Sequence, residues 1–387
     1  MVGIRALNRT YNKTLMGSHW KALTGIIIIA LLTLAYLPSS CLSENYGFSY
    51  QLIDHHDNSR HYRLSVAVPE SLYEYYAGKN HQFITENDFA KFVTPYALKP
   101  IADSLLEIYS GNEDFANGAL MIIHQIFYQA TNPSRYPVET IAKNEGDCDL
   151  LSYVLASILK AAGLDSVLLY YEHESHMNVG VYLESPPQDS RGEVYCVIRD
   201  DKKYYTAECT GNNWQSGWRV GECPEELKHA GIQIITLENS EQAHTGQVSA
   251  SYRTLAQTTL TLRTSTLWVV QGSVMSVEGE LSPPLQGKNV TIYVKTNNSP
   301  WTVLGTAIID SDGKFGFSWN VNAGGTCNFR ASWSGNENLA TADSPILTIT
   351  SLSTFFVLFL AIITIMIFIG AATYLSSRLS HQALTEA

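Results

Sequence analysis

One cysteine of this chain stands where a reactive thiol is expected. Cys148 follows Gly146 and Asp147 and opens a stretch whose apolar residues recur at helical spacing. The unpaired amides and the positive dipole end of a helix start favour a thiolate, and an amide there can donate to an oxyanion. The position therefore predicts a nucleophile for acyl transfer.

Acyl transfer also needs a group that exchanges protons with the thiol and with the leaving group. An imidazole does both, and of the eleven histidines His176 is the best placed, because it opens the strand-like run at residues 177–181. The run at residues 203–207 leads to the carboxylate of Glu208, which can orient the ring if the two strands are antiparallel neighbours. We predict a catalytic triad of Cys148, His176 and Glu208, with no cofactor.

The surrounding pattern predicts the elements that hold these residues. Residues 101–128 carry apolar side chains at helical spacing, with a break at Gly111 and Asn112. Residues 150–159 form one apolar helix face, which Gly163 ends. Four β-rich runs follow, at residues 166–171, 177–183, 193–198 and 203–207. A helical half followed by an antiparallel half indicates an α+β domain.

These residues resemble the transglutaminase-like superfamily, within the papain-like fold group. The resemblance rests on G-D-C at residues 146–148, the strand that begins at His176, and Y-Y-x-x-E-x-T at residues 204–210. It covers about residues 46–222 and is strongest over 137–208, where P-x-E-T precedes the cysteine as in microbial membrane-bound members. It implies Cys148 as the nucleophile, His176 as the general base and acid, and Glu208 as the orienting acid.

The chain also departs from the pattern of that superfamily. Many members have Asp in place of Glu208, and the tryptophan that animal transglutaminases place near the oxyanion has no counterpart between Trp20 and Trp214. Their calcium sites are not found. Hydrolysis of a peptide or isopeptide bond and acyl transfer to an amine share one thioester intermediate, and we favour hydrolysis because no acidic groove for an amine is visible. The alternative is a catalytically inactive surface protein that binds peptide or glycan with the same fold.

Other clusters offer weaker chemistry. Zinc could bind His173, Glu174 and His176, or H-H-D at residues 55–57, but no second ligand pair accompanies either group, so we predict no metal. Four further cysteines could form disulfides outside the cytoplasm, in a connectivity that the sequence leaves open, while Cys148 stays free: Cys196, Cys209, Cys223 and Cys327.

The second half of the chain changes character near Thr245. Over residues 250–350 helical spacing disappears, and short alternating runs are separated by turn signals at sandwich-like intervals. This half resembles the immunoglobulin-like β-sandwich modules of microbial surface proteins, which implies a spacing or adhesive role. The D-S-D-G stretch at residues 310–313 is better read as a hairpin turn than as a calcium loop, because further ligands are missing.

Both ends carry uncharged segments. Residues 352–375 lack any charge and are long enough for a transmembrane helix, and residues 25–43 are a signal peptide or a signal anchor. The first 21 residues hold four basic residues and no acid, which predicts that segment 1–43 comprises a cytoplasmic basic N-terminus followed by the signal peptide or anchor. The tail (376–387) is then cytoplasmic, and the transglutaminase-like domain (44–245) and the sandwich lie outside the cell membrane. The net charge of −11 argues against nucleic acid as a partner. The expected partners are a protein or peptide substrate and the membrane, and the oligomeric state stays open.

Overall fold

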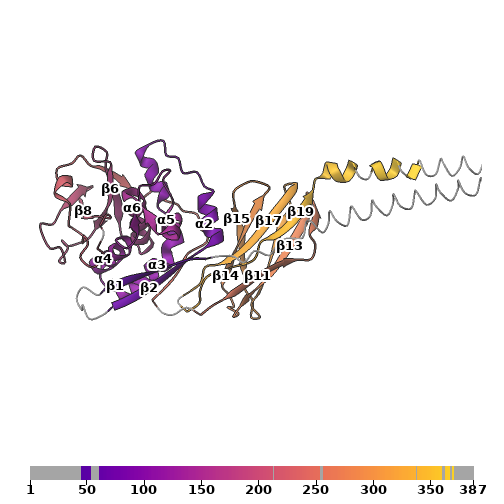
Figure 1. Ribbon diagram of the computed structural model, residues 1–387, viewed down its shortest axis with the longest axis horizontal. Coiled ribbons are helices and arrows are strands. Elements are labelled where there is room, and N and C mark those ends of the chain that lie inside the picture. Colours follow the sequence, from indigo (N-terminus) through magenta and orange to yellow (C-terminus); the bar gives the residue numbers. More distant parts are fainter. Residues whose placement is uncertain are drawn as a thin grey trace, which may run out of the picture. The chain divides into compact units, whose positions relative to one another are not determined.

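The computed structural model describes residues 45–53, 61–211, 213–252, 256–336, 338–359, 362–366 and 368–369 (Figure 1). Up to residue 252, helices and antiparallel strands share one large core, and after residue 256 the chain is β-structure around a second core. The helices of the first part are α2 (Glu70–Ala77), α3 (Pro95–Ile108), α4 (Asn112–Ile123), α5 (Pro137–Lys143) and α6 (Cys148–Ala161).

A five-stranded sheet and helix α6 carry the predicted triad. The strands run in the order β7 (Cys196–Arg199), β8 (Lys202–Ala207), β6 (His176–Tyr182), β5 (Ser166–Tyr171) and β9 (Gln233–Thr236), and each neighbouring pair is antiparallel. Helix α6 packs on β5 and β6 because its inner face is apolar and fully buried. Since Val179 of β6 pairs with Ala207 of β8, the start of β6 lies beside the residues that follow β8.

A second, three-stranded sheet flanks the helices. It has the order β1 (Asn45–Ile53), β2 (His61–Pro69) and β10 (Ser249–Ser251), so β1 is an edge strand. Helix α4 packs against β1 and α3 against β10. Val248 and Ala250 belong to the core of this first part, which therefore extends beyond the composition change near Thr245. A two-stranded parallel ladder, β3 (Phe127–Tyr128) with β4 (Glu145–Gly146), lies just before Cys148.

The second part is a β-sandwich of two sheets. One sheet has the order β11 (Thr259–Thr264), β13 (Val274–Ser282), β16 (Lys314–Asn320). The other has the order β12 (Trp268–Val270), β19 (Leu347–Leu352), β17 (Gly325–Trp333), β14 (Asn289–Thr296), β15 (Thr302–Ile308), with β18 (Ala342–Asp343) beside β17. In β13 buried and exposed residues alternate along the whole strand, as expected for one face against a core.

Charged side chains join the sandwich to helix α2. The carboxylate of Asp343 accepts hydrogen bonds from the backbone N–H and the hydroxyl of Ser71, both at 2.9 Å. Arg330, which is 3% exposed, forms ion pairs with Glu70 and Glu74 at 3.2 Å each. Asp343 thus supplies the first turn of α2 with an acceptor that its own N-cap residue, Pro69, lacks.

The predicted fold class is wrong. It was an α+β papain-like domain and an immunoglobulin-like sandwich, with transmembrane helices at the ends of the chain. Strand outweighs helix overall, and no helix among the described residues is long and apolar enough to cross a membrane. The predicted N-terminal signal peptide or anchor lies outside the described residues. The extracytoplasmic placement stays a prediction.

Candidate active site

Cys148 is the first residue of α6, and the turn before it is tightly packed. A Cβ at Gly146 would lie 3.0 Å from the Cβ of Leu150 and 3.2 Å from Thr140, so the backbone approaches the helix more closely than a side chain allows. Asp147 is the N-cap residue in an extended conformation, and its carboxylate accepts the N–H of Thr131 at 2.8 Å. Cys148 is 9% exposed, and its Sγ lies 3.8 Å from the carbonyl oxygen of Ser175. The helix start is therefore fixed, and the sulfur lies just below the surface.

His176 begins β6, directly after Ser175, whose positive φ of 49° turns the chain into the strand. Its Nε2 lies 2.9 Å from Oε2 of Glu208, which leaves Nδ1 for the thiol. Burial lowers the pKa of His176, but hydrogen bonds to Cys148 and Glu208 and the charges of both outweigh it and raise the pKa to about 10. The ring is therefore a cation at neutral pH.

Glu208 follows β8 and is fully buried. Besides the His176 ring, its carboxylate accepts the side-chain N–H of Asn178 at 3.2 Å, the backbone N–H of Thr210 at 2.8 Å and the hydroxyl of Thr210 at 2.6 Å. Burial raises the pKa of Glu208, yet the hydrogen bonds from His176 and Thr210 and the His176 charge lower it overall. This is a buried anion with all its lone pairs directed to donors, as an orienting acid requires.

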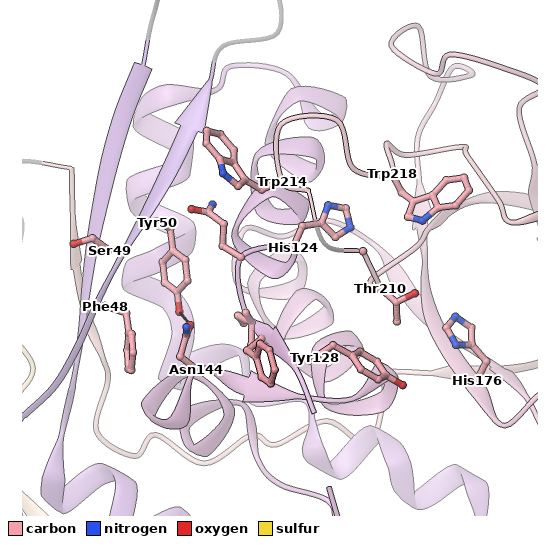
Figure 2. Close-up of a pocket in the computed structure, with 14 residues that line it drawn as sticks. Phe48, Ser49, Tyr50, His124, Tyr128, Asn144, His176, Thr210, Trp214 and Trp218 are labelled. Atoms are coloured by element: carbon pink, nitrogen blue, oxygen red, sulfur yellow. Dashed lines mark hydrogen bonds between the residues drawn. The ribbon is translucent and has the colours of Figure 1, made fainter. Parts of the chain in front are cut away.

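A cleft of about 1060 Å³ opens beside His176, which is the member of the triad that lines it. Figure 2 shows Phe48, Ser49 and Tyr50 of β1 at one end of it and His176 at the other. Its residues, all within the described ranges, include no Asp, Glu, Lys or Arg: Phe48, Ser49, Tyr50, His124, Gln125, Ile126, Phe127, Tyr128, Asn144, His176, Thr210, Gly211, Trp214 and Trp218. Apart from His176, the cleft is therefore lined by uncharged residues, and it is rich in aromatic rings.

Tyr128 and the loop of Trp214 and Trp218 form the walls near the triad. Tyr128 pairs with Gly146 through β3 and β4, two residues before Cys148, and is 47% exposed. Burial and the nearby charge of Cys148 raise the pKa of Tyr128, so its hydroxyl keeps the proton. The loop is held by Arg191, which donates to the carbonyl oxygens of residues 216 and 217 at 3.0 and 2.7 Å.

A buried histidine connects this wall to the triad. Nε2 of His124 donates to the carbonyl oxygen of Glu208 at 3.0 Å, and burial lowers the pKa of His124, which favours the neutral ring. A Cβ at Gly217 would lie 2.4 Å from Nδ1 of His124, so the tryptophan-bearing loop packs directly on the ring. His124 thus supports the backbone of Glu208, the orienting acid.

The three predicted site residues thus lie together, in the order thiol, imidazole, carboxylate. Sequence reasoning missed Asn178, His124 and Tyr128, because each lies in an element whose pattern predicts only packing. Thr210 was named only as part of the Y-Y-x-x-E-x-T motif. Its position two residues after Glu208 was the signal that could have predicted its hydrogen bond to that carboxylate.

The disulfides that the sequence left open are not formed among the described cysteines. Cys148, Cys196, Cys209, Cys223 and Cys327 are all free thiols. Among the described residues no group of three or more His, Cys, Asp or Glu could hold a metal ion, and residues 55–57 lie outside them.

Comparisons with known proteins identify no family. No family model matches the chain, and no curated protein matches it. Among solved structures, it is similar to a chitin-binding domain from Burkholderia pseudomallei (10% identity, 22% of this chain, 57% of that chain, TM-score 0.19). It is also similar to a tetra-tandem repeat of a large adhesion protein (11%, 48%, 42%, 0.22) and to red sea bream transglutaminase (11%, 82%, 64%, 0.18). The chain spans less than two thirds of each, and at these TM-scores none carries an argument.

Proposed function

We propose that this protein is an enzyme that performs thiol-dependent acyl transfer on amide bonds, with Cys148, His176 and Glu208 as its catalytic residues. The observation that supports this most is the buried Glu208 carboxylate on Nε2 of His176, at 2.9 Å, with the thiol on the other side of the ring. An ionised acid with no exposure is costly to bury unless it is paired, and here its pairing fixes an imidazole beside a thiol at a helix start.

The chemistry follows from these positions. The Cys148 thiolate attacks the carbonyl carbon of the substrate amide, and a C–S bond forms while the carbonyl oxygen becomes an oxyanion. The His176 imidazolium then gives its proton to the leaving nitrogen as the C–N bond breaks. Water attacks the thioester, His176 takes up its proton, and the carboxylic acid leaves with regeneration of the thiolate. Glu208 holds the ring and stabilises its charge throughout.

Two donors near the sulfur could stabilise the oxyanion. The backbone N–H of Cys148 lies in the first turn of α6 and has no partner within the helix. The protonated hydroxyl of Tyr128 lies on the neighbouring wall of the cleft, and Figure 2 shows its ring on the same side as His176.

Hydrolysis is favoured over transfer to an amine. An attacking alkylammonium substrate would need a carboxylate to hold it, and the residues that line the cleft include no Asp or Glu. The cleft is also open to water beside His176, which is 18% exposed.

The test uses p-nitrophenyl acetate with the full chain. We expect a burst of p-nitrophenol equal to the enzyme concentration and an acetyl group on the peptide that contains Cys148. The Cys148→Ala variant should give no burst, whereas Cys196→Ala, which removes another partly exposed thiol, should retain it. Absence of the burst in the parent chain would refute the proposal. β-Casein with dansylcadaverine then separates the two outcomes, because hydrolysis releases peptides and transfer to an amine labels the casein.

A further inference from the structure

The strand β1 presents a free edge to the cleft. It is the outer strand of its sheet, paired only with β2 among the described strands. The cleft touches three consecutive residues of it, Phe48, Ser49 and Tyr50. Successive side chains of a strand point to opposite faces, so a cavity in contact with three in a row lies along the strand's edge rather than on one face.

The backbone groups at that edge can be assigned from the neighbouring contacts. The side-chain amide of Gln125 accepts the N–H of Gln51 and donates to the C=O of Gln51, each at 2.8 Å. This pair of bonds is what one residue of an adjoining antiparallel strand would make. Two residues on, the N–H of Ile53 points the same way, toward the sulfur of Met121 at 3.5 Å. The outward groups on β1 are therefore those of odd-numbered residues.

By the same alternation, the N–H and C=O of Gly47 and Ser49 face outward, about 7 Å apart. Both residues are exposed, and no described residue makes a hydrogen bond to the outward backbone groups of either. Ser49 lines the cleft that continues to His176. Unpaired edge groups of this kind are a template for another strand.

We propose that the substrate is an extended polypeptide segment that adds to β1 as a further strand, through the backbone of Ser49 and Gly47, and so brings an amide bond to Cys148. This deepens the proposed function and rests on it for the chemical step. Backbone pairing gives affinity without a required sequence, and the aromatic lining, which is uncharged apart from His176, favours uncharged side chains next to the scissile bond. An unfolded chain is thus the fitting occupant, because a folded one already pairs its own amides.

The first test measures binding without chemistry. Fluorescein-labelled β-casein, an unstructured polypeptide, is titrated with the full chain carrying Cys148→Ala, and binding is read by fluorescence anisotropy. In that background Ser49→Pro removes the outward N–H, whereas the matched Ser49→Ala keeps it and removes only the hydroxyl. Proline is tolerated at an edge where the N–H faces away from the sheet. We expect about tenfold weaker binding for Ser49→Pro and less than about twofold change for Ser49→Ala.

The second test needs no variant at the edge. Amide hydrogen exchange of the Cys148→Ala chain, with and without β-casein, should slow at Gly47 and Ser49 and stay unchanged at Phe48 and Tyr50, whose N–H groups face β2. Equal affinity of the two Ser49 variants, equal exchange at odd and even positions, or no casein binding would each overturn the proposal. These readouts need no thiol. If β-casein slows exchange at Gly47 and Ser49 but the parent chain gives no p-nitrophenol burst, the strand addition is supported and only the proposed function is refuted.

Discussion

Replacing Glu208 by Gln tests the role of the buried acid in the triad. The carboxylate is fully buried and accepts bonds from His176, Asn178 and Thr210, so every position around it is a donor. A Gln side chain must place its own NH₂ against at least one of these donors. One buried donor without an acceptor costs about 2 kcal/mol, and the charge that favours the imidazolium is lost as well.

The stability that is lost in Glu208→Gln should depend on pH and be greatest within a defined pH range. The pKa of Glu208 is lowered in the fold, so its contribution to stability is present above its usual value of 4.5 and declines as pH falls through the folded value. The pKa of His176 is raised to about 10, so its contribution is complete below its usual 6.5 and declines as pH rises toward 10. The stability difference between the parent chain and Glu208→Gln should therefore be largest between about pH 4.5 and 6.5.

The assay combines urea unfolding across pH with the acyl-transfer rate. We expect the p-nitrophenol burst rate to fall by about 10²-fold or more, since the ring loses its orientation and its charge. The matched control is Glu139→Gln, which breaks another buried carboxylate–histidine pair, Glu139 with His81 at 2.8 Å, outside the cleft. It should lose comparable stability and keep the burst. Equal burst rates in Glu208→Gln and the parent chain would refute the orienting role.

Three further outcomes follow from the contacts described. If the Tyr128 hydroxyl donates a hydrogen bond to the oxyanion, Tyr128→Phe should lower the burst rate about tenfold and leave the alkylation of Cys148 by iodoacetamide unchanged. An unchanged burst rate would exclude this role of the hydroxyl. Asp343→Ala should cost about 2 kcal/mol in urea unfolding, because the N–H and hydroxyl of Ser71 lose their acceptor, whereas Asp312→Ala, at an exposed turn, should cost under about 0.5 kcal/mol. Equal costs would show that the contact with α2 contributes nothing. Arg191→Ala should release the loop that carries Trp218 and change KM more than kcat, measured with β-casein as substrate; a change in kcat alone would contradict a role limited to the wall of the cleft.

Local elements were predictable because their signals are local. The break at Gly111 and Asn112 separates α3 from α4 as the spacing predicts, and the run at residues 166–171 is β5 with the same bounds. The three site residues could be singled out because each stands at the start or end of such an element. The helix start at Cys148 and the strand start at His176 are confirmed.

Long-range features were not predictable, because the signals in the sequence are local. The pairing of β10 with β2 joins residues about 180 positions apart, and no local period reveals it. The aromatic wall depends on Arg191 reaching a loop 25 residues later, through its side chain. The transmembrane prediction used hydropathy over residues 352–375 alone, and no helix among the described residues is long and apolar enough to agree with it.

The central claim is that the His176–Glu208 pair makes Cys148 a reactive nucleophile, and thiol alkylation tests it most directly. Substoichiometric iodoacetamide labels the full chain at pH 6, and peptide mass spectrometry compares Cys148 with the more exposed Cys196 in the same molecules. We predict that Cys148 reacts at least about tenfold faster than Cys196 despite its lower exposure, and that His176→Ala removes this advantage. Equal rates at pH 6, both rising toward pH 8.5 as for an ordinary thiol and both unaffected by His176→Ala, would contradict the account.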